Sequence, residues 1–230
     1  MSSTVRWCHA RECTDAGAMG RPTAPGTVGA WRRGGPRRRR TGSRQQPLFL
    51  RHGHGARAGV DVRDEERRTP LLLAVHGDHV ELARLLVEAG ADPDAQDRRE
   101  DSSWLATGVT GSVAMLHTLL PAGPDLKLRN RFGGIALIPA SERGHVGYVR
   151  ELLRVTDIDV DHVNRLGWTA LLEAVILGDG GRAHQEIVEL LLAAGATPGL
   201  PDGDGVTALE HAERRGFAEI AALLRNRTPR

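Results

Sequence analysis

The chain has 230 residues, of which 40% are hydrophobic and 3% aromatic, and it carries a formal net charge of +2. Its longest apolar runs are only a few residues, such as Leu71–Val75, whereas a helix that spans a bilayer needs about 20 apolar residues. These values exclude a membrane-spanning helix and predict a core built from Leu, Val and Ala. Because the first residues contain no apolar segment typical of a secretory signal, we expect a cytoplasmic protein.

Residues 1–56 differ in composition from the remainder of the chain. Residues 1–60 contain 12 Arg, 10 Gly and 4 Pro but only two acidic side chains, whereas residues 61–230 hold 19 basic and 27 acidic side chains. The first segment buries too little apolar surface to offset the entropy of an ordered chain, so we expect a disordered tail. Its positive charge makes salt-sensitive, non-specific nucleic-acid binding an alternative function.

After residue 57 the sequence repeats itself with a period of 33 residues. Periods of this length are typical of arrays in which each repeat is one supersecondary unit. Residues that recur at this spacing are Val80, Val113 and Val146; Leu86, Leu119 and Leu152; and Leu71, Trp104 and Leu137.

The first repeat indicates two short helices joined by a turn. Thr69 followed by Pro70 is a favourable helix start, and Leu71–Val75 predicts a short, buried first helix. Apolar residues then recur at helical spacing over residues 80–86, and Gly90 supplies the left-handed residue that ends the second helix. Five such helix pairs are expected, beginning near Thr69, Ser102, Ile135, Thr169 and Thr207.

Three positions depart from the regular pattern. Pro139 falls inside the expected first helix of the third unit, where an interior proline would cost about 3 kcal/mol. We therefore expect that helix to be short and to begin at Pro139. The insertion Gly178–Arg182 lengthens the fourth unit. The helix at Leu71–Val75 lacks a preceding unit, so either Pro47–Leu50 covers it in part or the first unit frays.

Three stretches carry a family resemblance: TPLLLAVHGDHVELARLLVEAGADPDAQD (69–97), GWTALLEAV (167–175) and GVTALEHAERRGFAEIAALL (205–224). They closely resemble ankyrin repeats, and the resemblance extends over about residues 58–225. It implies an all-α solenoid of about five helix-turn-helix units with short extended turns, within residues 57–230. It also implies a non-enzymatic scaffold that binds another protein. The arginine bias, 30 Arg against one Lys, favours a bacterial source.

The resemblance places the partner-binding surface at the turn tips and the concave face. By register, the three central tips align Arg98, Arg131 and Arg165 in one row, with an apolar row beside it. Arginine with aromatic residues is the composition of interface hot spots. The alternative is a solvated charged fringe, with Trp168 packed on its neighbour. The candidate partner-binding residues are Arg98, Arg99, Arg131, Phe132, Arg165, Leu166 and Trp168.

The glycine-rich insertion is a weaker candidate site, for an anion. Glycine-rich turns can aim backbone N–H groups at an anion, but this segment lacks the strand–loop–helix context and the Lys-Ser/Thr of a phosphate-binding loop. A plain enlarged turn is therefore the simpler interpretation. The candidate anion-binding residues are Gly178, Gly180, Gly181 and Arg182.

No sequence pattern predicts catalysis or metal binding. The histidines do not form an HExxH motif, and Cys8 and Cys13 lie in the tail without the spacing of a metal-binding pair. No serine or cysteine is paired with a base in a recognisable motif. We therefore expect no catalytic residue, no cofactor and no metal.

Overall fold

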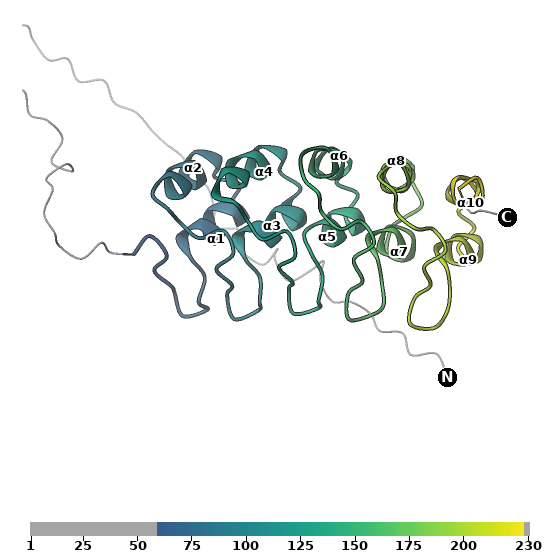
Figure 1. Ribbon diagram of the computed structural model, residues 1–230, viewed down its shortest axis with the longest axis horizontal. Helices are drawn as coiled ribbons and strands as arrows, with labels where there is room; N and C mark the ends of the chain where they lie inside the picture. The colour runs from purple at the N-terminus through teal and green to yellow at the C-terminus, as the bar shows by residue number, and fades with distance from the viewer. Residues whose placement is uncertain (1–58, 228–230) are drawn as a thin grey trace, which may run out of the picture. The chain divides into compact units, whose positions relative to one another are not determined.

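The structure, a computed structural model, describes residues 59–227 (Figure 1). The expectations for the tail at residues 1–56, including its disorder, its nucleic-acid binding and the cover by Pro47–Leu50, lie outside the described residues. The α-helices of the described part are α1 (Pro70–His76), α2 (Val80–Glu88), α3 (Ser103–Thr110), α4 (Val113–Leu119), α5 (Leu137–Glu142), α6 (Val146–Val155), α7 (Ala170–Ile176), α8 (Arg182–Ala193), α9 (Ala208–Arg214) and α10 (Ala218–Arg225).

The described helices form two layers, which confirms the expected all-α solenoid. Each odd-numbered helix contacts the next odd-numbered helix, and each even-numbered helix contacts the next even-numbered one. Figure 1 shows five long loops that leave the odd-numbered layer on the same side and lie in a row. Because each unit contacts only its neighbours, the fold fixes the order and alignment of these loops.

Hydroxyl N-caps start four of the five odd-numbered helices. Thr69, Ser102 and Thr169 each accept a hydrogen bond at 3.2 Å from the backbone N–H three residues on, and Thr207 accepts one at 3.4 Å from Glu210. The Thr207 backbone N–H in turn donates to Glu210 Oε2 at 2.7 Å, which completes a capping box. Each such cap stabilises its helix by about 1 kcal/mol.

The third unit begins differently, and the expected start at Pro139 is wrong. Helix α5 begins at Leu137, after Ala136, and has no side-chain cap. Pro139 is therefore the third residue of the helix. The N–H groups of a first helical turn have no intrahelical acceptor, so the proline removes no helical hydrogen bond there. With six residues, α5 is nevertheless the shortest α-helix of the described part, as a short helix was expected.

The first unit exposes a face that the other units bury. Leu82 of α2 is 48% exposed, and Leu73 and Leu85 are 43% and 55% exposed. No described unit precedes α1 and α2, which accounts for the difference. The residues at the place of Leu82 in the other four units are at most 1% exposed: Met115, Tyr148, Ile187 and Ile220.

Glu173 of α7 is the one acidic residue among the buried polar residues of the described part, with 4% of its surface exposed. Its Oε1 accepts a hydrogen bond from Asn164 Nδ2 at 2.8 Å. Burial disfavours the charged carboxylate, and the negative charge of Glu142 adds to this effect. Together they raise the pKa of Glu173 to about 8, although the Asn164 bond opposes the rise. The carboxyl is therefore mostly protonated at neutral pH.

We predict that the first unit opens more readily than the third. Less packed apolar surface must be exposed to separate α1 and α2 from the array, so their local opening should cost less free energy. Hydrogen exchange followed by mass spectrometry should show faster exchange in residues 69–89 than in residues 135–155. Equal protection of the two segments would contradict this prediction.

We also predict that Glu173 makes the stability of the fold depend on pH. The pKa is about 8 in the folded chain against 4.5 for the free group, so the folded state holds the proton more tightly. The stabilisation is complete below about pH 4.5 and is lost as the pH rises through about 8. Within that window the free energy of unfolding should fall by up to about 1.4 kcal/mol per pH unit.

The variant Glu173→Gln isolates this effect, because an amide oxygen can still accept the Asn164 bond but does not titrate. Urea unfolding of both proteins should show wild type losing stability relative to the variant between about pH 5 and pH 8. A difference that stays constant over this range would show that Glu173 ionises normally in the fold.

Candidate protein-binding surface

The five loops in the row of Figure 1 share one turn design, and we call them the tips. In each tip the N–H of the first residue donates to the carbonyl four residues on, at 2.8–3.1 Å. The fourth residue has a positive φ of 59–79°. These bonds give all five tips the same backbone. The tips begin at Asp64, Asp97, Asn130, Asn164 and Asp202.

The side chain of the first residue adds further hydrogen bonds that hold the tip in the same shape. From the second tip onward, its Oδ1 accepts bonds from the N–H groups two and four residues on, at distances of 2.7–3.0 Å. Asp and Asn make such turns readily because their short side chains reach their own backbone. Each tip is therefore held without help from a ligand.

Two pairs of neighbouring tips are also bonded to each other. The Arg98 backbone N–H donates to the Glu66 carbonyl at 3.0 Å, and the Arg165 N–H donates to the Phe132 carbonyl at 2.9 Å. The Arg165 guanidinium in addition donates to the Arg131 carbonyl. Between the second and third units, Gln96 just before the second tip donates to the Glu100 and Arg129 carbonyls at 2.7 and 2.8 Å. Hydrogen bonds thus join the first tip to the second and the third to the fourth, and Gln96 links the chain beside the second and third.

The structure places the three candidate arginines at equivalent positions. Arg98, Arg131 and Arg165 each follow the first residue of their tip, and Arg98 and Arg165 are exposed. Arg131 is half-buried, with its guanidinium 4.6 Å from the centre of the Phe132 ring. The arginines of the three central tips thus line up along the edge, in the order that the register of the sequence predicted.

The third position of the same tips forms the adjacent row. It holds Arg99, Phe132 and Leu166, of which Arg99 is exposed, Leu166 is 37% exposed and Phe132 is half-buried. Trp168 is the fifth residue of its tip, half-buried and packed against the core. Part of the Trp168 side chain therefore borders the edge, and the remainder packs against the core.

Acidic side chains lie at both ends of the row of tips. The first tip contains Asp64, Glu65 and Glu66, and the last contains Asp202 and Asp204. Between them, the tips at residues 130–134 and 164–168 contain no acidic side chain. The second tip carries Asp97, Glu100 and Asp101 beside its two arginines, so only the third and fourth tips combine positive and apolar side chains without an acidic one.

Two tips are tied to the helix that follows by a polar pair that the sequence analysis missed. Asn164 Nδ2 donates to Glu173 Oε1 at 2.8 Å in the fourth unit. In the fifth, His211 Nε2 and Asp202 Oδ2 lie 2.7 Å apart. Both pairs are nine residues apart in the sequence, which is the signal that could have revealed them. The first three units have Leu73, Ala106 and Pro139 at that place and no such pair.

Two side chains, from the glycine-rich insertion and from α8, make the hydrogen bonds that order the insertion. Asp179 Oδ1 accepts a bond from the Gly181 N–H and lies 2.8 Å from both this nitrogen and His184 Nδ1. The other ring nitrogen of His184 lies 2.9 Å from the Glu142 carbonyl. The carboxylate of Asp179 thus takes the place at the start of α8 where an anion would bind.

The glycines of the insertion allow close packing. A Cβ atom on Gly178 would lie 2.6 Å from the His184 ring, and one on Gly180 would lie 2.4 Å from the Phe217 ring. Arg215 donates to the Gly178 carbonyl at 2.9 Å. The geometry therefore matches an enlarged turn that is packed against the fifth unit, which favours the simpler interpretation over an anion-binding site.

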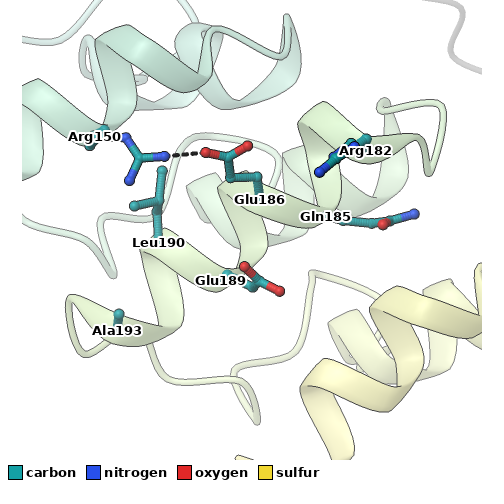
Figure 2. Close-up of a pocket in the computed structure, with 7 residues that line it drawn as sticks. All are labelled: Arg150, Arg182, Gln185, Glu186, Glu189, Leu190 and Ala193. Carbon is teal, nitrogen blue, oxygen red and sulfur yellow. Dashed lines mark hydrogen bonds and ion pairs between the residues drawn. The ribbon is translucent and has the colours of Figure 1, made fainter.

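Arg182, the last candidate of that loop, lines a groove of about 420 Å³ between α6 and α8 (Figure 2). An ion pair between Arg150 and Glu186 joins the two helices across the groove. Its charged lining has both signs, so it favours no one class of ligand. The full lining is Arg150, Arg182, Gln185, Glu186, Glu189, Leu190 and Ala193.

Residues 59–227 contain neither a membrane-spanning helix nor a cluster of metal ligands. No helix in this range is long and apolar enough to cross a membrane. Nowhere in it do three or more His, Cys, Asp or Glu side chains gather in an arrangement that could hold a metal ion.

Comparison with known proteins identifies the repeat. Residues 104–202 match the family model "Ankyrin repeats (3 copies)", and residues 66–98 match the model "Ankyrin repeat". The ankyrin repeat protein YahD of Escherichia coli (strain K12) is 45% identical over 168 residues, which cover 72% of this chain and 84% of that protein.

Solved structures agree with this match. An ankyrin repeat domain from Acinetobacter baumannii is 50% identical, with a TM-score of 0.71, over 74% of this chain and 87% of that chain. A second solved ankyrin repeat protein is 41% identical, with a TM-score of 0.72, over 74% of this chain and 85% of that chain. With its stacked helix pairs and aligned tips, the chain belongs to the ankyrin repeat family.

Proposed function

We propose that this chain is a non-enzymatic scaffold that binds a partner protein through its three central tips and the adjoining concave face. Ankyrin repeats are in general modules for protein–protein interaction. The observation that supports the central tips as the binding surface is the alignment of Arg98, Arg131 and Arg165 at one position of three consecutive tips.

The rigidity of the edge supports binding. Each tip is closed by its own backbone and side-chain bonds, and the third tip is bonded to the fourth. A surface that is ordered before it meets a partner loses little conformational entropy on binding, which leaves more of the contact energy as affinity.

The chemistry of the edge favours a partner with both acidic and apolar side chains. Guanidinium groups bind carboxylates with two parallel hydrogen bonds, and Leu166 with Phe132 offers apolar surface beside them. The first and last tips have Glu65 and Gly203 in place of the arginine. An acidic partner is therefore favoured at the central tips, most of all at the third and fourth, which contain no acidic side chain, and this adds specificity.

Charge reversal of the three arginines tests this function. The full chain is used to select ligands from a library of displayed random peptides, and their affinities are measured by fluorescence anisotropy. The variant Arg98→Glu, Arg131→Glu, Arg165→Glu should bind the selected peptides on the order of tenfold more weakly or worse, because three attractive contacts of up to about 1 kcal/mol each become repulsive.

A matched variant with the same charge change controls for net charge. Arg143, Arg182 and Arg214 are exposed and lie outside the tips, so Arg143→Glu, Arg182→Glu, Arg214→Glu should retain the ligands. Equal affinity of wild type and the tip variant would show that the partner binds elsewhere on the array.

A further inference from the structure

The spacing of the tip arginines is set by the fold. Packed helices lie about 8–10 Å apart, and each tip adds one helix pair to the array. A hairpin-like tip is two strands wide, which at about 4.8 Å per strand also gives about 10 Å. Because the packing of successive helix pairs keeps the tips in register, this spacing is held in the free protein.

Among extended conformations of a partner chain, one repeats its side chains on the same side at about this spacing. A polyproline II segment has three residues per turn and rises about 3.1 Å per residue, so every third side chain lies on the same side, about 9 Å apart. In a β-strand, residues three apart face opposite sides. In an α-helix the nearest match is seven residues, about 10.5 Å.

The width of the edge favours the extended segment over the helix. The arginine row and the apolar row occupy adjacent chain positions, as in Arg131–Phe132 and Arg165–Leu166, so together they form a strip only two residues wide. A helix with its side chains is about 10–12 Å across and would extend beyond this strip onto parts of the tips that carry neither row.

We propose that the partner presents an extended, polyproline II-like segment with an acidic residue at every third position, and with apolar residues between. Its carboxylates meet Arg98, Arg131 and Arg165 in turn, and its apolar residues meet Phe132 and Leu166. The first and last tips have Glu65 and Gly203 in place of the arginine, which limits the match to three consecutive acidic positions. This inference rests on the proposed function and specifies the chemistry of the partner.

Defined peptides test the spacing with the full chain. The first peptide contains three Glu-Leu-Pro triplets. The second has the same composition with its three Glu adjacent, and the third carries its Glu seven residues apart in an Ala-rich helix. In fluorescence anisotropy the first should bind tightest, by about two- to fivefold for each additional carboxylate that meets an arginine.

A double-mutant cycle tests the pairing of single residues. Changing the middle Glu of the first peptide to Gln should weaken binding to wild type about two- to fivefold and leave binding to Arg131→Ala unchanged. The middle position makes this independent of the direction in which the peptide lies. In the control variant Arg143→Ala, the change to Gln should weaken binding as it does in wild type.

The outcomes separate this inference from the proposed function. Equal or tighter binding of the second or third peptide, or no binding of any of the three, overturns the proposed spacing. If the library-selected peptides still depend on the three arginines, the proposed function stands in that case. If those peptides bind the charge-reversed tips unchanged, both proposals fail.

Discussion

The constraint on which this structure depends is that each repeat can bury its apolar face only against its neighbours. Leu82 shows this most clearly, because it is 48% exposed while Ile187 and Ile220 at the same place are fully buried. The same constraint holds successive units in one orientation and so aligns the loops between them. The edge of five aligned tips is therefore a consequence of core packing.

Packing and the binding edge are also linked through polar side chains. Asn164 orders its tip by accepting bonds from the Leu166 and Trp168 N–H groups, and its amide donates to the buried Glu173. Glu173, whose pKa is raised by burial, is therefore bonded directly to a residue of a central tip. In the fifth unit His211 and Asp202 make the corresponding contact.

The sequence predicted those features that depend on neighbouring residues or on the period. Thr69, Ser102, Thr169 and Thr207 mark helix starts because an N-cap is a local contact. The start of α5 was missed because a proline is tolerated throughout a first turn, so Pro139 does not fix the first residue.

Features that depend on distant residues could not be predicted. The close packing of Gly180 involves Phe217, in another unit. The deep burial of Glu173, which raises its pKa, depends on the packing of α7 against α5. The register of the tip arginines was readable from the period, whereas the bonds that join one tip to the next were not.

The most direct test of the binding edge is a titration of the isotope-labelled full chain with a selected peptide, followed by nitrogen–proton NMR correlation spectra. The account predicts that the largest shifts fall on the backbone amides of Arg98, Arg131 and Arg165 and on the indole N–H of Trp168. Largest shifts in α6 and α8, around the groove of Figure 2, would contradict it and move the binding surface to the even-numbered layer.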